Sequence, residues 1–414
     1  MPRILIAGAG IGGLTTALSL HAHGIGNVRV VEAAPAIRTA GVGLNLLPNA
    51  VRELAALDLS ETLAAQGVSA RRLAFYNRHG QLIWQEPRGL AAGHRWPQLS
   101  VHRADLLATL AAAVRNRLGA AALRTGARLT GCAPTAGGRV RAELAHPAGP
   151  PTVTEADILI GADGIRSTVR AALYPGEGPP PGNGMVMWRG TTWGEPFLTG
   201  DTMIVTGDDV RRVVLYPIRR DPSSGRVQIN WVAARPARSP GRDDWNRGVP
   251  GSAVLAHFGD WRFDWLDIPA VLAAATEVYE YPMVDRDPLP RWTFGRMTLL
   301  GDAAHAMYPM GSNGATQAIV DAAVLARAVA THGDAAAALA AYENARRPPM
   351  TRLQASNRRM GPEIVISMAH RRAPDGFADV HDVIPAAELA AISARYAAAG
   401  GFDVDTVNNR KDPP

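Results

Sequence analysis

The sequence predicts an α/β fold in which two α/β portions enclose a β-rich insertion. The prediction rests on a β-α-β pattern at the start of the chain, a series of short strands between residues 185 and 234, and a buried strand followed by long helices after residue 296. With 414 residues, of which 47% are hydrophobic and 19% charged, the chain is long enough to form more than one hydrophobic core.

The first element is a strand over residues 3–7, which is followed by a glycine-rich turn and a helix to about His23. A second strand over residues 28–32 completes the β-α-β unit. This order places the glycines between a strand and the beginning of a helix, which is the arrangement of a dinucleotide-binding turn.

Each glycine of this turn has an expected role. Gly8 permits a tight turn, Gly10 lets the backbone approach a pyrophosphate, and Gly12 and Gly13 belong to the helix start, where Gly13 packs closely on the strand. The helix N-terminus offers N–H groups to the phosphates. Glu32, 24 residues after Gly8, is placed to accept hydrogen bonds from an adenosine ribose. The pattern suits NAD as well as FAD.

The middle of the chain is rich in strands. Residues 72–86 form a predicted hairpin that turns at His79-Gly80, a helix is predicted over 103–118, and an apolar strand over 156–161. The Pro/Gly cluster at 175–184 is the candidate linker. Further strands are predicted over 185–191, 202–206, 211–218 and 226–234.

The last part returns to α/β structure, with a strand over 296–300 and helices over most of 314–360 and over 386–398. We therefore expect three parts. Residues 1–71, 97–180 and 283–360 form a discontinuous cofactor-binding domain, residues 72–96 and 181–282 a β-rich substrate domain, and residues 361–414 a helical tail.

Composition excludes several classes of protein. The net charge is +6, but the basic residues are nearly all arginine, Lys411 is the only lysine, and no basic stripe or motif indicates nucleic-acid binding. Cys132 is the only cysteine, so no disulfide within the chain and no thiolate metal site is expected, and no other metal motif is present. No run of 18 apolar residues predicts a membrane span. We expect a cytoplasmic protein, either monomeric or homodimeric.

Two later motifs favour FAD over NAD. The first is Gly-Ala-Asp-Gly at 161–164, and the second is Leu-Leu-Gly-Asp-Ala-Ala-His at 299–305, followed by Pro309 and Asn313-Gly314. With these motifs the chain resembles the group A flavoprotein aromatic hydroxylases, the family of p-hydroxybenzoate and salicylate hydroxylases, over roughly residues 2–350. The resemblance implies a Rossmann-like FAD-binding domain with an inserted β-sheet substrate domain and C-terminal helices.

The resemblance also assigns cofactor-binding roles. It implies that Glu32 holds the adenosine ribose, that Arg103 reaches the FAD with Arg38 as a second arginine, and that Asp163 links FAD and NAD(P)H binding. Gly301 and Asp302 are expected at the ribityl or pyrophosphate region.

Two loops are expected to hold the flavin ring. Residues 41–45, which include Gly43, match the family loop on one side of the ring. The segment after Pro309 precedes a helix whose N-terminus is expected at the pyrimidine edge, where its dipole stabilises reduced flavin. Ser312 stands at the first glycine of the family pattern P-x-x-G-x-G, and Gly311 precedes it. The residues expected in this segment are Pro309, Gly311, Ser312, Asn313 and Gly314.

The implied activity is that of a single-component monooxygenase, which uses FAD, NADH or NADPH, and O2 to hydroxylate a small aromatic substrate through a flavin C4a-hydroperoxide. Within the family the chain is most similar to the phenazine-modifying monooxygenases of pyocyanin biosynthesis, through residues 187–190, 281–290 and 307–311. This similarity implies decarboxylative hydroxylation of a phenazine carboxylate. A salicylate-type substrate, or hydroxylation or epoxidation of a larger polycyclic natural product, remains open. A flavin-dependent halogenase would need a Trp-x-Trp-x-Ile-Pro segment, which the chain lacks.

The candidate substrate pocket lies on the β-rich insertion. Met185, Met187 and Arg189 share one face of their predicted strand. We expect Met203 and Tyr216 to line the pocket, with Trp231 on a neighbouring strand. Arg189 either contacts a substrate carboxylate or, as we prefer, stabilises the domain interface. No side-chain nucleophile is expected, because the flavin carries the chemistry.

Three polar residues near these motifs are expected to be structural. His305 is interpreted as a helix-start residue near phosphate, not a catalytic base. Asp285 and Asp287 are interpreted as anchors where the chain crosses between domains.

Overall fold

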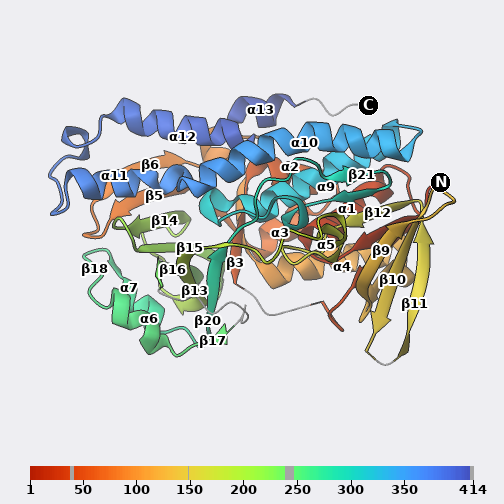
Figure 1. The fold of residues 1–414 in the computed structure, drawn as a ribbon. Helices are drawn as coiled ribbons and strands as arrows, with labels where there is room; N and C mark the ends of the chain where they lie inside the picture. The colour runs from red at the N-terminus through yellow and green to blue at the C-terminus, as the bar shows by residue number, and fades with distance from the viewer. Residues whose placement is uncertain (38–41, 148, 238–246, 411–414) are drawn as a thin grey trace.

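The fold is described from a computed structural model, which describes residues 1–37, 42–147, 149–237 and 247–410 (Figure 1). Arg38 and Lys411 lie outside these ranges. Figure 1 shows two sheets connected by a layer of long helices, with α12 and α13 following one another along the upper edge above α10.

The first sheet has six strands, and all but the edge strand β21 run parallel. β1 (Ile4–Ala7) lies at its centre and pairs with β2 on one side and β12 on the other, so the order of the strands reverses at β1. Ligands of such sheets bind at the carboxyl end of the strands where the order reverses. The other strands are β2 (Val28–Glu32), β8 (Leu123–Thr125), β12 (Ile158–Gly161), β21 (Thr293–Phe294) and β22 (Met297–Leu299).

The second sheet has eight strands, in the order β17-β20-β13-β16-β15-β14-β5-β6. The predicted hairpin is confirmed, and Gly80 adopts a positive φ of 79° at its turn. The predicted linker is too long at its C-terminal end, because Gly182 already belongs to β13, where it pairs with Val284 of β20. The strands are β5 (Arg72–Asn77), β6 (Leu82–Pro87), β13 (Gly182–Gly194), β14 (Thr202–Gly207), β15 (Arg212–Arg220), β16 (Val227–Pro236), β17 (Arg247–Gly248) and β20 (Val278–Val284).

One face of the second sheet is closed by two short helices that the sequence did not predict, α6 (Gly251–Phe258) and α7 (Ile268–Ala273). Between sheet and helices lies an aromatic core that includes Trp188, Trp231 and Trp261. The opposite face of the sheet lines a cavity, so strand alternation sends neighbouring side chains either into this core or into the cavity.

Two three-stranded sheets and a two-stranded sheet of β18 (Arg262–Phe263) and β19 (Leu266–Asp267) complete the β structure of the described residues. β3 (Gly43–Leu46), β7 (Gln98–His102) and β4 (Val68–Ala70) form one three-stranded sheet, between the two large sheets. β9 (Arg128–Pro134), β10 (Val140–His146) and β11 (Gly149–Ala156) form the other, which the sequence did not predict. Cys132 lies within β9, and burial raises the pKa of its thiol to about 11.

Helices cover the first sheet. α1 (Ile11–Ala22) packs against α4 (Arg103–Leu118) and the long α9 (Asn313–Thr331), and α10 (Ala335–Arg358) packs on α9. The remaining helices of this part are α2 (Pro48–Ala55), α3 (Ser60–Gln66), α5 (Thr168–Leu173) and α8 (Asp302–His305).

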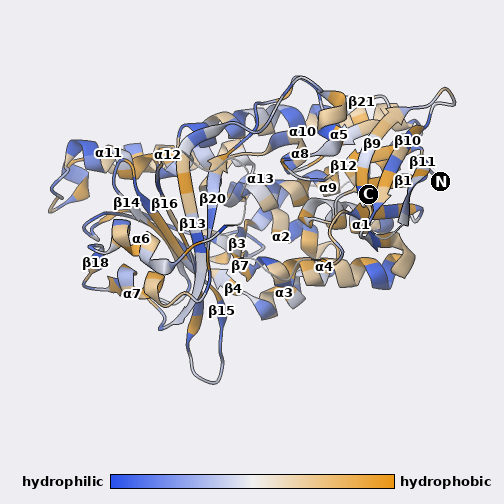
Figure 2. Ribbon diagram, turned by 60° about the horizontal axis from the view of Figure 1, so that its bottom comes forward, coloured by the Kyte–Doolittle hydropathy of each residue, from blue (hydrophilic) through white to orange (hydrophobic). Residues whose placement is uncertain are grey.

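The C-terminal part holds α11 (Ile364–Arg372), α12 (Ala386–Gly400) and α13 (Val404–Asn409). α11 was not predicted, and it packs its apolar residues on β5 and β6. In Figure 2 the region around β12 is largely hydrophobic, whereas the end of α11 is hydrophilic. Within the described residues, no helix has both the length and the apolar character that crossing a membrane requires.

Candidate functional site

The principal cavity of the described residues has a volume of about 1450 Å³. It begins at the carboxyl end of β1 and extends to the face of the second sheet that is opposite the aromatic core. A site for a single small ligand usually occupies roughly 300–1,000 Å³. The cavity therefore has room for a dinucleotide and a second, smaller molecule.

The glycine turn forms one end of the cavity. Gly8 has a φ of 101°, and a Cβ there would lie 2.4 Å from the carbonyl oxygen of Ala162. A Cβ at Gly13 would lie 2.0 Å from the carbonyl oxygen of Gly8, whereas one at Gly10 would meet nothing within 4 Å. No side chain caps α1 at Gly10, so its first N–H groups are available to a pyrophosphate.

Glu32 lies beside this turn at the end of β2 and lines the cavity. Its Oε2 accepts a hydrogen bond from the N–H of Ala9 at 2.9 Å, and its Oε1 accepts one from the N–H of Ala34 at 2.8 Å. These bonds orient the carboxylate and leave lone pairs on both oxygens, which suit the hydroxyls of a ribose. The glycine turn and Glu32 thus fit the adenosine half of FAD.

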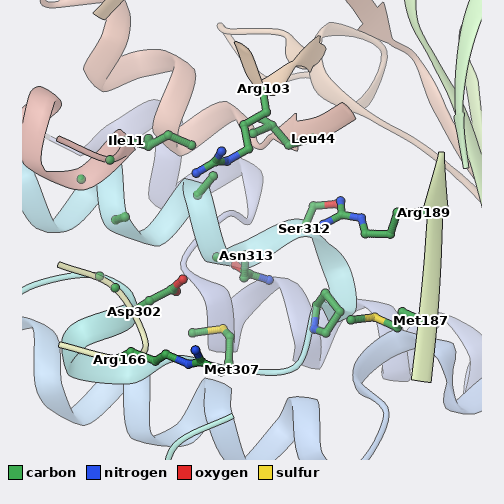
Figure 3. Close-up of a pocket in the computed structure, with 18 of the residues that line it drawn as sticks. Ile11, Leu44, Arg103, Arg166, Met187, Arg189, Asp302, Met307, Ser312 and Asn313 are labelled. Carbon is green, nitrogen blue, oxygen red and sulfur yellow. The ribbon is translucent and has the colours of Figure 1, made fainter. Parts of the chain in front are cut away.

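Arg103, Asp302 and Arg166 surround the middle of the cavity (Figure 3). Asp302 faces the cavity in the first turn of α8, and surrounding protein raises its pKa by desolvation, while the positive charges of His305 and Arg103 act in the opposite direction. Arg103 begins α4 and extends into the cavity opposite Asp302. The carboxylate of Asp302 can accept hydrogen bonds from hydroxyls, and the guanidinium groups of Arg103 and Arg166 can pair with phosphate.

Asp163 also lines the cavity, but its carboxylate is bound to the start of α5. It accepts hydrogen bonds from the hydroxyl of Ser167 and from the N–H of Thr168, the latter at 2.7 Å. Desolvation raises the pKa of Asp163, and these hydrogen bonds act against that rise. The side chain thus orders the turn that follows β12.

His305 points away from the cavity. It is buried, and its Nε2 lies 2.6 Å from Oδ2 of Asp321, whose Oδ1 accepts from Nε of Arg346 at 2.6 Å. Oδ2 of Asp321 also accepts from the N–H of Gly301 at 3.2 Å. The pair with His305 therefore supports the turn that presents Asp302 and leaves His305 no contact with the cavity.

Asp285 and Asp287 both pair with Arg358 of α10. The distances are 2.6 Å from Nε to Asp285 and 2.7 Å from Nη2 to Asp287. Neither acid lines the cavity, so neither is placed for acid/base chemistry there.

The segment from Pro309 to Gly314 lines the cavity next to the second sheet. Gly311 and Ser312 both have a φ of 61°, so Ser312 adopts the left-handed conformation, which glycine adopts without steric cost. Tyr396 of α12 supports this segment: its hydroxyl accepts from Nδ2 of Asn313 at 2.9 Å and lies 2.9 Å from the carbonyl oxygen of Met310. No side chain caps α9, so its first N–H groups face the cavity.

Tyr216 lies at the other side of the cavity, on β15. It is buried, and burial raises its pKa to about 12, while hydrogen bonds with Asn230, Asn45 and Arg189 oppose that shift. Nη2 of Arg189 also donates to the carbonyl oxygen of Gly43 at 3.2 Å. Arg189 thus connects β13 to β3, as the interface interpretation expected, while still lining the cavity (Figure 3).

Met203 lines the same wall, where its sulfur accepts from Nδ2 of Asn45 at 3.4 Å. Gly43 lies directly against Asn230, whose Oδ1 accepts from the N–H of Gly43 at 2.6 Å. A Cβ at Gly43 would lie 2.6 Å from Cβ of Asn230, so the close approach of β3 to the sheet requires glycine.

The prediction that Trp231 lines the pocket is wrong. In the register of β16, Trp231 pairs with Gly190 and Leu215, and its side chain lies in the aromatic core on the opposite face. Its neighbours Val232 and Ala234 are the residues of β16 that line the cavity.

Sequence reasoning also missed several cavity residues. Arg212 lies on the same side of β15 as Tyr216, so strand alternation provided a signal for it. Glu363 gave no such signal, because it is brought to the cavity by a short 3-10 turn in the C-terminal part. The missed residues include Arg166, Asn183, Arg212, Met283, Met360 and Glu363.

Comparison with known proteins agrees with this geometry. The model of the FAD binding domain family matches residues 2–190 and 266–356. The chain is 49% identical over 361 residues to a phenazine 1,6-dicarboxylic acid hydroxylase of Lysobacter antibioticus, a match that covers 86% of this chain and 89% of the relative. It is 34% identical over 368 residues to a 6-hydroxynicotinate 3-monooxygenase of Bordetella bronchiseptica, covering 85% and 90%.

A solved structure of a salicylate hydroxylase substrate complex superposes on this chain with a TM-score of 0.75. The superposition covers 99% of this chain and 97% of that one. The two sequences are 22% identical, so this likeness concerns the fold alone. It confirms the expected arrangement of a parallel-sheet domain, an inserted β-sheet and C-terminal helices.

Proposed function

Since this chain belongs to the family of flavoprotein aromatic hydroxylases that carry the FAD-binding domain, we propose that it hydroxylates a phenazine carboxylate with loss of the carboxyl group. The reaction converts the aromatic acid, O2, NAD(P)H and a proton into the phenol, CO2, NAD(P)⁺ and water. The observation that carries the proposal is the long apolar wall beside the Pro309–Gly314 segment, together with 49% identity to a hydroxylase named for a phenazine dicarboxylate.

The chain's own residues bind and orient the cofactor. The α1 N-terminus takes the pyrophosphate, Glu32 the ribose, and Arg103 with Asp302 the region between pyrophosphate and ring. The chemistry that FAD would supply there is acceptance of a hydride from NAD(P)H and activation of O2. The uncapped N-terminus of α9 would stabilise negative charge on a flavin ring bound beside it.

The second sheet binds the substrate and keeps water out. Met187, Met283 and Val232 supply apolar surface on which a flat aromatic molecule stacks. Tyr216 keeps its proton at neutral pH, because its pKa is about 12, and so can donate a hydrogen bond to the substrate. Positioning of the ring close to the flavin then determines which carbon reacts.

The three-part division of the chain is part of this proposal. Residues 1–71, 97–180 and 283–360 bind FAD, residues 72–96 and 181–282 bind substrate, and residues 361–414 support the flavin segment. The contacts of Tyr396 with Met310 and Asn313 support the last assignment. The single cysteine is in keeping with a cytoplasmic enzyme, monomeric or homodimeric.

The test is anaerobic reduction of the FAD-loaded protein by NADH and by NADPH, with and without phenazine-1-carboxylate, phenazine-1,6-dicarboxylate, salicylate and indole. We expect a phenazine carboxylate to accelerate bleaching of oxidised flavin at least tenfold. Admission of O2 should then give a product in which hydroxyl replaces carboxylate. If salicylate or indole accelerates reduction and the phenazines do not, the phenazine assignment is wrong.

A further inference from the structure

The cavity wall continues along β15 beyond Tyr216 to Arg212. These two residues are four apart on one strand, a separation of about 14 Å. Val214 lies between them, and Val232 and Ala234 of β16 lie beside them on the same face. The cavity thus has an apolar wall with a polar side chain at each end, and a single-ring substrate would reach only part of it.

Arg212 is almost completely buried, with 5% of its surface exposed. Its Nη2 donates to Oγ of Ser367 at 2.7 Å and its Nη1 to the carbonyl oxygen of Arg211 at 3.0 Å, whereas Nε has no partner among the described residues. Burial lowers the pKa of this guanidinium, so an anion beside it would be stabilised strongly.

The acidic residues next to Arg212 are paired with other arginines. Asp208 pairs with Arg211 at 3.0 Å, and Asp209 pairs with Arg371 at 3.0 Å. Within the described part of the chain, no carboxylate forms an ion pair with Arg212 itself. The charges of Glu363, Asp208 and Asp209 act on Arg212 without a close ion pair, so its guanidinium can still pair with an anionic group that enters the cavity.

Glu363 faces the same end of the cavity from the turn Gly361–Glu363. It is 6% exposed, and no described residue donates a hydrogen bond to its carboxyl group. Burial raises its pKa to about 7, although the charge of Arg212 acts to lower it. An acid at this position carries a proton over part of the physiological pH range and can donate it in a hydrogen bond.

We propose that Arg212 and Glu363 form a subsite for a carboxylate on the substrate ring that is farthest from the reacting carbon. The proposal rests on the proposed phenazine activity. The guanidinium pairs with the carboxylate, and the protonated carboxyl of Glu363 donates a hydrogen bond to it. The reacting carboxylate lies near Tyr216, so the subsite makes the enzyme selective for a dicarboxylated tricyclic substrate over a monocarboxylated one.

Three other charged or titratable groups lie near Glu363 on neighbouring elements. Tyr396 of α12 has its pKa raised by burial, Arg88 at the end of β6 borders a small adjoining cavity with Glu363, and Asp209 is held by Arg371. We therefore attribute a change of dicarboxylate binding between pH 6 and pH 8.5 to Glu363.

The test measures dissociation constants of phenazine-1-carboxylate and phenazine-1,6-dicarboxylate from the change in flavin absorbance of the FAD-loaded enzyme. The wild type should bind the dicarboxylate at least tenfold more tightly at pH 6. Arg212→Met should weaken dicarboxylate binding roughly 10- to 100-fold, since a charged hydrogen-bonded pair is lost, and change monocarboxylate binding less than threefold. Glu363→Gln should keep the preference at pH 8.5, where the wild type loses it.

Arg352→Met, which removes an exposed arginine, is the matched control. If Arg212→Met does not load FAD, Arg212→Lys takes its place and should lose part of the preference. Equal weakening of both ligands, or no weakening, refutes the subsite. If neither phenazine binds to the wild type, the proposed function fails; if both bind equally tightly, the proposed function stands and the subsite fails.

Discussion

Replacing Gly311 with alanine should destabilise the enzyme through two separable effects. Gly311 has a φ of 61°, and the left-handed conformation costs a residue with a Cβ about 1–2 kcal/mol. The new Cβ would also lie 2.3 Å from the ring and hydroxyl of Tyr396, and such overpacking costs typically about 1–3 kcal/mol. The reduced freedom of the unfolded chain returns about 0.4–1 kcal/mol. We expect a net loss of about 1–5 kcal/mol.

A double-mutant cycle separates the two effects. In a Tyr396→Ala background the ring is absent, so Gly311→Ala should cost only the backbone part, about 1 kcal/mol or less. The free energy of unfolding is measured by urea denaturation of the four proteins, and FAD affinity by the recovery of flavin fluorescence. Gly314→Ala is the control, because a Cβ there would meet nothing within 4 Å and should change stability little.

The reasoning predicts a coupling energy of about 1–3 kcal/mol between positions 311 and 396. If Gly311→Ala costs the same in both backgrounds, contact with Tyr396 does not determine the residue at 311. If it costs nothing in either, the left-handed conformation at Gly311 is not required for the fold.

Three further predictions test other parts of the site. Glu32→Gln should raise the dissociation constant of FAD roughly 10- to 100-fold, because a charged acceptor is lost, and an unchanged constant in fluorescence titration would remove Glu32 from the ribose site. Trp231→Ala should lower the free energy of unfolding by about 3–5 kcal/mol, with little effect on which aromatic compounds bind; altered ligand selectivity with full stability would contradict its place in the core. Burial acts to raise the pKa of Asp321, but the charges of His305 and Arg346 lower it to about 2. The stabilising effect of the ionised Asp321 is therefore complete above about pH 4 and is lost as the pH falls towards 2. The stability difference between wild type and Asp321→Asn, measured by urea unfolding, should shrink over that range, and a constant difference would show that this carboxylate does not titrate as inferred.

The parts of the fold that were predicted have strong local patterns. The turn from Gly8 to Gly13 and the strand ending at Glu32 are consecutive in the chain, so their geometry follows from local sequence. The sheet of β9, β10 and β11 was missed because most of its outer strand is exposed and shows no alternation of apolar and polar residues. The two large sheets were found because their strands are bounded by turns and have buried apolar residues.

The candidate site shows where local patterns stop being informative. Alternation along β13 predicted that Met187 and Arg189 share a face, and the structure places both on the cavity. Trp231 was misplaced because the face to which it points depends on the register of β16 with its neighbours, and a shift of one residue reverses that face. Glu363 and Tyr396 reach the site through tertiary contacts that no short segment of sequence encodes.

The hydroxyl of Tyr396 has a consequence for exchanging parts between relatives. It contacts Asn313, Asn357 and Met310, which belong to α9, to α10 and to the turn before α9, and the ring occupies the space that a side chain at 311 would need. The structure of the Pro309–Gly314 segment therefore depends on the residue that α12 places against it. A chimera that takes this segment from one enzyme and α12 from another would combine two surfaces that do not pack against each other. Recombination should be tolerated best when the segment and α12 come from the same parent enzyme.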